Sequence, residues 1–226
     1  FHNAILREVD MTIKGDVLTS TDELAKKCFN MIKTFYKKEY SEIFEMFYGI
    51  HVSKVVSTCK TYTNTTPESF FLLTLPIPCR NANLIQCLDE YTAIETLDGD
   101  NMLEIDDNGT KGVCKKQILF WSFPKILVIM LKRFGNNLRK NKDRIDFPLV
   151  DLDLSKYTIG YDRKNYIYDL YGICNHSGGV LGGHYWAYVK NANEKWYDFN
   201  DTRVKEISEN NLITEKAYCL FYRKKY

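Results

Sequence analysis

A histidine and an asparagine in two short segments near the C-terminus are the residues with the clearest capacity for chemistry. Segment 182–189 carries His184 as its third residue, and segment 196–201 carries Asn200. Residues 191–194 separate the two segments and form a turn signal. An imidazole held beside a carboxamide or carboxylate supplies two members of a nucleophile–base–orienter set. The orienting group accepts a hydrogen bond from one ring nitrogen and leaves the other nitrogen as a general base.

The spacing of the two segments predicts a β-hairpin that brings this pair together. If Lys190 pairs with Glu194 across a three-residue loop, His184 lies directly opposite Asn200. Directly opposite residues of antiparallel strands share one face and have Cβ atoms about 4.5–5.5 Å apart. We therefore expect His184 and Asn200 to be cross-strand neighbours.

The residues around the pair leave alternatives open. A β-bulge would change the pairing, and Asp198 or Asp201 would then be the orienting group. Gly182 and Gly183, directly before the histidine, permit close approach of another backbone segment. Taken alone, a histidine near the start of a strand is more often structural than catalytic, because single motifs are weak evidence.

The elements that must position the pair are predicted from hydrophobic spacing. Two helices are expected near the N-terminus, the first capped by a box of Ser20 and Glu23, the second capped by Ser41 and stopped at Gly49. Polar stretches predict exposed, solvated loops at 98–112 and 135–144. Branched and aromatic residues predict strands, in particular at 118–121, 126–131, 166–174, 184–189, 195–200 and 218–223.

Longer stretches around the pair resemble the ubiquitin-specific proteases, which are papain-like cysteine deubiquitinases. Leu-Gly-Gly-His-Tyr at 181–185 and Trp-Tyr-Asp-Phe-Asn-Asp-Thr-Arg-Val at 196–204 resemble the histidine box of that family. Further segments resemble the family in the same order along the chain, namely 40–49, 73–78, 123–134, 171–179 and 217–223. The resemblance therefore covers nearly the whole chain.

This resemblance implies an α+β fold, a papain-like hand with a helical thumb and an antiparallel β palm and fingers that grips ubiquitin. Residues 1–50 would be a thumb remnant, and 51–226 would be the fingers and palm of a partial catalytic domain. His184 would be the general base, Asn200 the residue that orients it, and the adjacent Asp201 a contributor.

The same resemblance implies a binding groove for the C-terminal tail of ubiquitin beside the histidine. Tyr185 would be one wall of this groove, and residues 178–183 would form a mobile loop next to it. The substrate-binding residues implied are Ser177, Gly178, Gly182, Gly183 and Tyr185.

The nucleophile of the family has no counterpart in the chain. The family's Cys box lies upstream of its histidine box, at the start of a helix, where the thiol pKa is lowered. Residues 1–6 resemble the end of a thumb helix that follows this box. We therefore expect the box to lie before Phe1 or to be absent, and the chain alone to be inactive. The chain's cysteines, none with the neighbours of such a box, are Cys28, Cys59, Cys79, Cys87, Cys114, Cys174 and Cys219.

The zinc site that many family members carry has only an incomplete counterpart in this chain. That site uses two Cys-x-x-Cys pairs, whereas single cysteines, Cys59 and Cys114, stand at the corresponding places. His51 is a weak candidate for a third ligand. The sequence predicts no metal and no cofactor, and it predicts that Cys79 and Cys87 are buried.

Composition bounds the remaining possibilities. The chain has 226 residues, 45% of them hydrophobic and 27% charged, with a formal net charge of +2. This balance gives no electrostatic case for nucleic acid or a membrane as partner.

The odd number of scattered cysteines favours reduced thiols in the cytoplasm or nucleus. The chain begins without methionine, so we expect it to be a piece of a longer protein.

Three functions remain as hypotheses. The first is a deubiquitinase that cleaves the isopeptide or peptide bond after the C-terminal glycine of ubiquitin. The alternative is a catalytically inactive pseudo-protease that only binds ubiquitin. Retention of both His184 and Asn200 favours the enzyme. A hand that serves a ubiquitin-like modifier is a third possibility.

Overall fold

The structure, a computed structural model, describes every residue except 136, 137 and 226. The chain forms two compact units, each assembled from three separate segments. Unit 1 consists of Phe1–Phe70, Thr92–Pro124 and Leu154–Asn165. Unit 2 consists of Phe71–Tyr91, Lys125–Asp153 and the segment from Tyr166 to the C-terminus.

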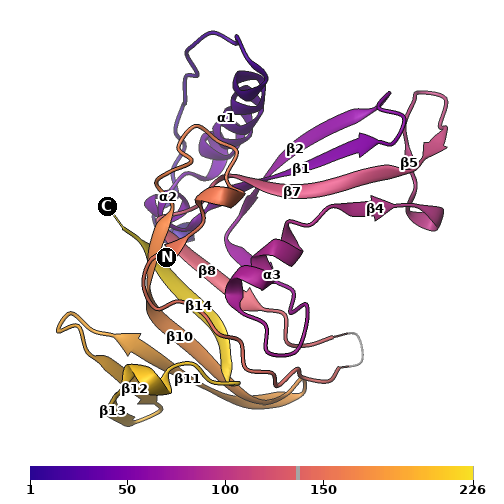
Figure 1. Ribbon diagram of the computed structural model, residues 1–226. Coiled ribbons are helices and arrows are strands. Elements are labelled where there is room, and N and C mark those ends of the chain that lie inside the picture. Colours follow the sequence, from indigo (N-terminus) through magenta and orange to yellow (C-terminus); the bar gives the residue numbers. More distant parts are fainter. Residues whose placement is uncertain (136–137, 226) are drawn as a thin grey trace. The chain divides into compact units, whose positions relative to one another are not determined.

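Unit 1 joins two helices to a small antiparallel sheet (Figure 1). The helices are α1 (Ser20–Glu39) and α2 (Glu42–Phe47), preceded by the 3-10 turn η1 (His2–Ala4). The sheet has the strand order β2-β1-β7-β4, with β1 (Gly49–Ser57), β2 (Thr63–Phe70), β4 (Glu95–Leu97) and β7 (Cys114–Ser122). Unit 1 also contains η2 (Gly99–Asn101), η3 (Ser155–Tyr157) and a short hairpin of β5 (Leu103–Glu104) and β6 (Lys111–Gly112).

The N-terminus of α1 is capped one residue earlier than expected. Thr19, in extended conformation, accepts a hydrogen bond from the Asp22 backbone at 3.2 Å, and Asp22 accepts one from the Thr19 backbone at 2.8 Å. The predicted box of Ser20 and Glu23 is therefore wrong, because Ser20 is already the first helical residue. The core of unit 1 consists of Ala25, Cys28, Ile50, Val52 and Trp121.

The second helix begins as predicted. The Ser41 side chain accepts a hydrogen bond from the Phe44 backbone at 3.4 Å and caps α2. The helix ends at Phe47, and Gly49 is the first residue of β1 rather than the stop itself. The stretch 98–112 is mostly exposed and forms the tip around β5 and β6, as expected of a loop or hairpin tip.

Unit 2 is built around an eight-stranded sheet (Figure 1). Its main strand order is β13-β12-β11-β10-β14-β8-β3, and β9 pairs with β10 off this path. The strands are β3 (Leu72–Leu75), β8 (Ile126–Leu131), β9 (Leu152–Asp153), β10 (Ile167–Gly179), β11 (Gly182–Lys190), β12 (Trp196–Asn200), β13 (Arg203–Ile207) and β14 (Ala217–Lys224). The helix α3 (Leu84–Tyr91) and the 3-10 turn η4 (Glu209–Asn211) complete the unit.

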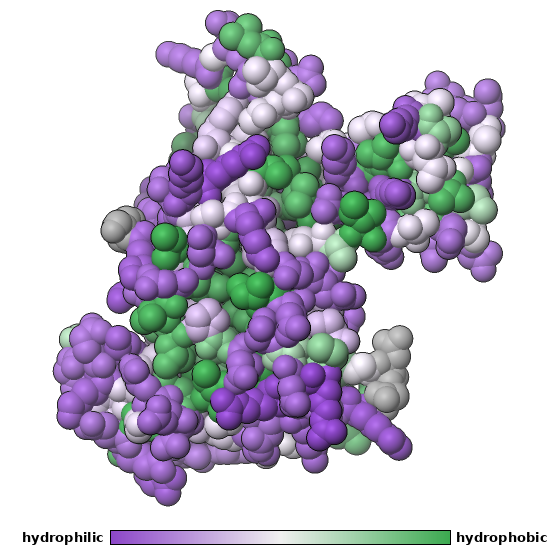
Figure 2. All heavy atoms as spheres, viewed as in Figure 1, coloured by the Kyte–Doolittle hydropathy of each residue, from purple (hydrophilic) through white to green (hydrophobic). Residues whose placement is uncertain are grey.

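The core of unit 2 lies around β8, whose Leu127, Ile129 and Leu131 are fully buried. The strand β8 lies between β14 and β3, and its continuous apolar run, Ile-Leu-Val-Ile-Met-Leu, is typical of a strand that is largely buried on both faces. The surface over β11, β12 and β13 is predominantly hydrophilic on the face shown in Figure 2. This end of the sheet carries the predicted functional residues. The fold is α+β with mostly antiparallel sheets, as expected.

The structure contains no membrane-crossing candidate among its described helices. Neither their length nor their apolar content reaches what a bilayer span requires.

Candidate active site

The hairpin of β11 and β12 carries the histidine and the asparagine, but its register differs from the expected one. Lys190 pairs with Trp196, not with Glu194, so the connection has five residues. The loop closes on itself because the Asn191 backbone donates to the Lys195 carbonyl at 2.9 Å, and Glu194 takes a positive φ of 62°. Lys190 and Glu194 meet only through their side chains, as an ion pair at 2.7 Å.

This shift of the register by two residues leaves the predicted pair on one face. Side chains alternate along a strand with period two, so an even shift preserves which face each side chain occupies. His184 Nε2 lies 2.7 Å from Asn200 Oδ1, diagonally across the two strands. Because a carboxamide oxygen only accepts, Nε2 carries the hydrogen, and in a neutral ring Nδ1 then keeps its lone pair. The structure thus brings together the imidazole and the amide that the sequence predicted.

The two carboxylates that remained as alternatives occupy different places. Asp201 Oδ2 lies 3.9 Å from His184 Nε2, and its side chain is 76% exposed. Asp198 lies opposite Tyr188, is buried, and has Oδ2 3.8 Å from Lys205 Nζ. Asn200 is therefore the residue that holds the ring, with Asp201 as an outer neighbour.

The predicted substrate-binding residues lie on β10 and β11. Ser177 is directly opposite His184, and Gly178 is directly opposite Gly183. The expectation of a loop over 178–183 is wrong, because both strands continue to a two-residue turn at positions 180–181. Gly178 has a φ of +127°, which lets the two strands approach closely at this end of the hairpin.

A buried histidine next to this hairpin was not predicted as a site residue. His176 is 2% exposed, and its ring stacks on Tyr185 with centroids 4.4 Å apart. Burial is the main cause that lowers its pKa below the ordinary value, and the positive charge of Lys140 adds to this effect. Lys140 Nζ donates to the His176 carbonyl at 2.5 Å. Only the sequence Asn-His-Ser before the glycines signalled this residue.

Lys140 belongs to the stretch 135–144, which was expected to be a solvated loop. Residues 136 and 137 lie outside the described part of the chain. Lys140 is half-buried, and this partial burial is the main cause that lowers its pKa. The stretch therefore contributes to the surroundings of His176 instead of being only a surface connection.

Among the described residues, no cysteine forms a hydrogen bond with the side chain of His184. All seven cysteines are free thiols, and Cys174 and Cys219 face each other across β10 and β14. Burial raises the pKa of Cys28 and of Cys219 to about 12, which makes them poor nucleophiles. Cys87 is buried as expected, whereas Cys79 is exposed because it lies in the irregular segment before α3.

The residues considered for zinc have other neighbours. His51 Nε2 lies 3.0 Å from Glu68 Oε2 across β1 and β2. Cys59 is exposed, and Cys114 is buried in β7 opposite Ser57. Within the described residues, no three His, Cys, Asp or Glu side chains gather in a way that could hold a metal ion.

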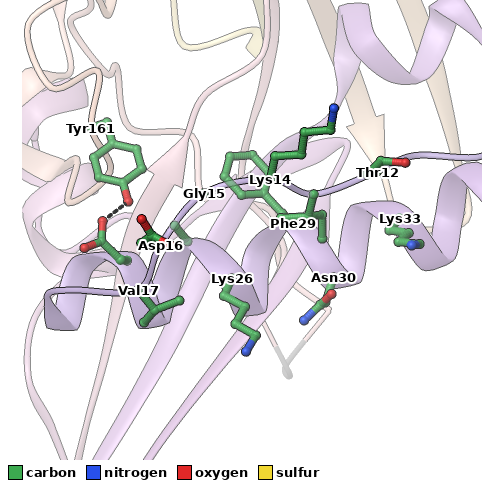
Figure 3. A pocket seen from close by; sticks show the side chains of 13 residues that line it. Thr12, Lys14, Gly15, Asp16, Val17, Lys26, Phe29, Asn30, Lys33 and Tyr161 are labelled. Carbon is green, nitrogen blue, oxygen red and sulfur yellow. Dashed lines mark hydrogen bonds between the residues drawn. The ribbon is translucent and has the colours of Figure 1, made fainter.

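A cavity in unit 1 carries neither member of the His–Asn pair. It has a volume of about 500 Å³ and lies between α1 and residues 12–17 (Figure 3). The Tyr161 hydroxyl donates to Asp22, the main cause that lowers the pKa of this carboxyl to about 2. The side chains of Lys14 and Lys26 extend in different directions, so their charges do not converge on one point.

An imidazole held by a carboxamide has the geometry that a general base and its orienting residue require. The chain matches the family described as ubiquitin carboxyl-terminal hydrolase over residues 1–222. It therefore belongs to the ubiquitin carboxyl-terminal hydrolase family.

Individual relatives agree with this assignment. The chain is 34% identical over 212 residues to the probable ubiquitin carboxyl-terminal hydrolase R319 of Acanthamoeba polyphaga mimivirus, covering 89% of this chain and 45% of the relative. It is 34% identical over 204 residues to ubiquitin carboxyl-terminal hydrolase 2 of Gallus gallus, covering 87% and 57%. The chain thus spans about half the length of these relatives.

A solved structure with the same fold is that of the SAGA Ubp8/Sgf11/Sus1/Sgf73 DUB module bound to ubiquitin aldehyde. The match has a TM-score of 0.71 and 29% sequence identity, and it covers 90% of this chain and 49% of the other.

Proposed function

We propose that the intact protein is a cysteine-type deubiquitinase that hydrolyses the isopeptide or peptide bond after the C-terminal glycine of ubiquitin. The observation that supports this proposal most strongly is the hydrogen bond of 2.7 Å between His184 Nε2 and Asn200 Oδ1. It aims the free nitrogen of the ring, Nδ1, away from the amide and makes it available as a base.

The proposed reaction needs a thiol from sequence that precedes Phe1. In the first step the thiol proton passes to His184 Nδ1 while the sulfur bonds to the carbonyl carbon of the last glycine. The leaving amine then takes the C–N electron pair and receives this proton. Water next attacks the thioester and gives one proton through His184 to the departing sulfur. The ubiquitin carboxylic acid that forms loses its remaining proton to the solvent and leaves as the carboxylate. Asn200 holds the ring throughout, and Asp201 stabilises the charged ring from 3.9 Å.

The substrate side of the proposal uses the exposed end of the β10–β11 hairpin. Ser177, Gly178, Gly182 and Gly183 would present backbone to the ubiquitin tail, and Tyr185 would flank it. Tyr185 is 54% exposed although its ring stacks on His176, so it offers a fixed aromatic surface to a ligand. We further propose that residues 1–50 are a thumb remnant and 51–226 the fingers and palm, and that the protein acts in the cytoplasm or nucleus.

The proposal is tested with ubiquitin that carries a thiol-reactive group at its C-terminus. The protein extended upstream of Phe1 is compared with the 226-residue chain. We expect the extended protein to form a covalent adduct at a cysteine before Phe1, and the 226-residue chain to form none. Binding of plain ubiquitin without an adduct would favour the pseudo-protease. An adduct at one of the seven cysteines of the chain would overturn the assignment of the nucleophile.

A further inference from the structure

Trp186 lies against the ring of His184. The centroids of the two rings are 5.8 Å apart, and the ring planes are inclined by only 18°. The two residues are two positions apart on β11, so they share one face of the strand. Trp186 is half-buried, whereas the side chain of His184 is 47% exposed.

The sheet register places Trp186 next to the other member of the pair as well. Ala187 pairs with Phe199 on β12, so Asn200 stands opposite Trp186 at the next position. On the other side Trp186 pairs with Asn175 of β10, which is fully buried. Trp186 is thus fixed between two neighbouring strands, on the face that carries both His184 and Asn200.

An exposed hydrogen bond needs such support because water competes for both of its partners. A ring that stacks on a fixed indole can tilt little, and both of its edges then point along the indole surface. In this plane Nε2 of His184 is directed toward Asn200, and Nδ1, on the other side of Cε1, is directed away from that amide. The indole, whose centroid lies 5.8 Å from that of the imidazole, also shields part of the ring from water.

We propose that Trp186 is a positioning residue that fixes the imidazole plane of His184 and protects the His184–Asn200 hydrogen bond from water. This inference rests on the proposed function. Trp186 itself touches neither the thiol nor the scissile bond in this scheme, and it acts only through His184.

The test is nuclear magnetic resonance of the 226-residue chain labelled with ¹⁵N-histidine. The chain has four histidines, and the His184 signals are identified by their loss in His184→Ala. In the unsubstituted chain we expect neutral His184 to carry its hydrogen on Nε2. In Trp186→Leu we expect this hydrogen to exchange with water at least tenfold faster and the Nδ1–H tautomer to appear. Trp186→Phe, which keeps an aromatic face, should restore most of both properties.

The backbone amide spectrum of β10–β12 distinguishes positioning from a purely structural role. We expect this spectrum to be native-like in both variants, so that changes in the His184 signals do not come from a disrupted sheet. Unchanged exchange and tautomer in a folded Trp186→Leu would overturn the proposal, as would equal defects in Leu and Phe variants that are both folded. If Trp186→Leu does not fold, the test uses Trp186→Tyr and Trp186→Phe instead. Both variants must then show an exchange rate and a tautomer of His184 close to those of the unsubstituted chain, or the proposal fails. These signals do not depend on hydrolysis, so an inactive intact protein with the expected signals would overturn the proposed function only.

Discussion

Gly183 lies so close to His176 that a Cβ atom at Gly183 would come within 2.3 Å of His176 Nε2 and 2.4 Å of the Ser177 carbonyl. Gly183 directly precedes His184, so the close approach of these two strands sets where the histidine side chain begins. Glycine is required for space at position 183, as the sequence suggested for both glycines before His184. At Gly182 the prediction is wrong, because nothing lies within 4 Å of a Cβ there.

Gly183→Ala is expected to destabilise the chain by about 2 kcal/mol, since the added methyl group must displace backbone or a buried ring. The measurement is urea denaturation followed by circular dichroism. Gly182→Ala is a matched control, because nothing lies within 4 Å of a Cβ at that position. Equal stability of the two variants would show that the strands separate at no cost.

Arg133 is a buried cation whose guanidinium donates to backbone carbonyls. It is 1% exposed, and its guanidinium donates to the carbonyls of Ala217 and Asp143 at 2.7 Å each. Arg133→Leu should therefore cost about 3 kcal/mol, because buried carbonyls lose their donors. Arg144→Leu, at an exposed residue paired with Asp146, should change the free energy of unfolding by less than about 0.5 kcal/mol. Similar urea midpoints for the two variants would contradict this assignment.

Asp22 makes the stability of unit 1 depend on pH. Its hydrogen bonds with Tyr161 and Thr19 lower its pKa from 3.8 to about 2. A lowered pKa in the folded state means that the stabilisation is complete above about pH 4 and is lost as the pH falls toward 2. Asp22→Asn should therefore flatten the decline in melting temperature between pH 5 and pH 2, whereas Glu23→Gln should leave this contribution in place. An equal flattening in both variants would argue against the capping box of Thr19 and Asp22.

Cys59 should be the most reactive thiol of the chain toward iodoacetamide at pH 7. Hydrogen bonds with the hydroxyls of Ser57 and Thr61 lower its pKa to about 7, so about half of it is thiolate at this pH. Thr61→Val should slow its alkylation several-fold, as measured by mass spectrometry of the modified peptide. Cys59→Ser should leave the proposed deubiquitination by the extended protein unchanged, because Cys59 belongs to unit 1 whereas His184 and Asn200 belong to unit 2. Faster labelling of Cys28 than of Cys59 would contradict this prediction.

The sequence predicted the His184–Asn200 contact but not the register that makes it. Hydrophobic alternation fixes which face a side chain occupies, and this survives a shift of two residues. The loop length depends on the backbone of Glu194, whose positive φ no pattern of residue types indicates. The prediction of the α1 cap was wrong for a similar reason. Thr19 and Ser20 both carry hydroxyls, and only backbone geometry selects between them as the N-cap.

Other features could not be predicted because burial of polar groups depends on tertiary neighbours. His176 and Arg133 lie in segments whose residue types do not distinguish a buried polar side chain from an exposed one. The helix α3 was overlooked although it had a signal, since Asn83 and Gln86 cap its start reciprocally at 2.9 Å. The thumb boundary at residue 50, the substrate-binding residues and the localisation stay predictions.

The most direct test of the account is the turnover of a fluorogenic ubiquitin C-terminal amide by the protein extended upstream of Phe1. We predict that His184→Ala lowers kcat by about 10⁴-fold to 10⁶-fold and Asn200→Ala by about 10-fold to 10³-fold, because one is the base and the other orients it. Asn210→Ala, at an exposed residue of η4, is the matched control and should retain full activity. Turnover that persists in His184→Ala would contradict the assignment of His184 as the base.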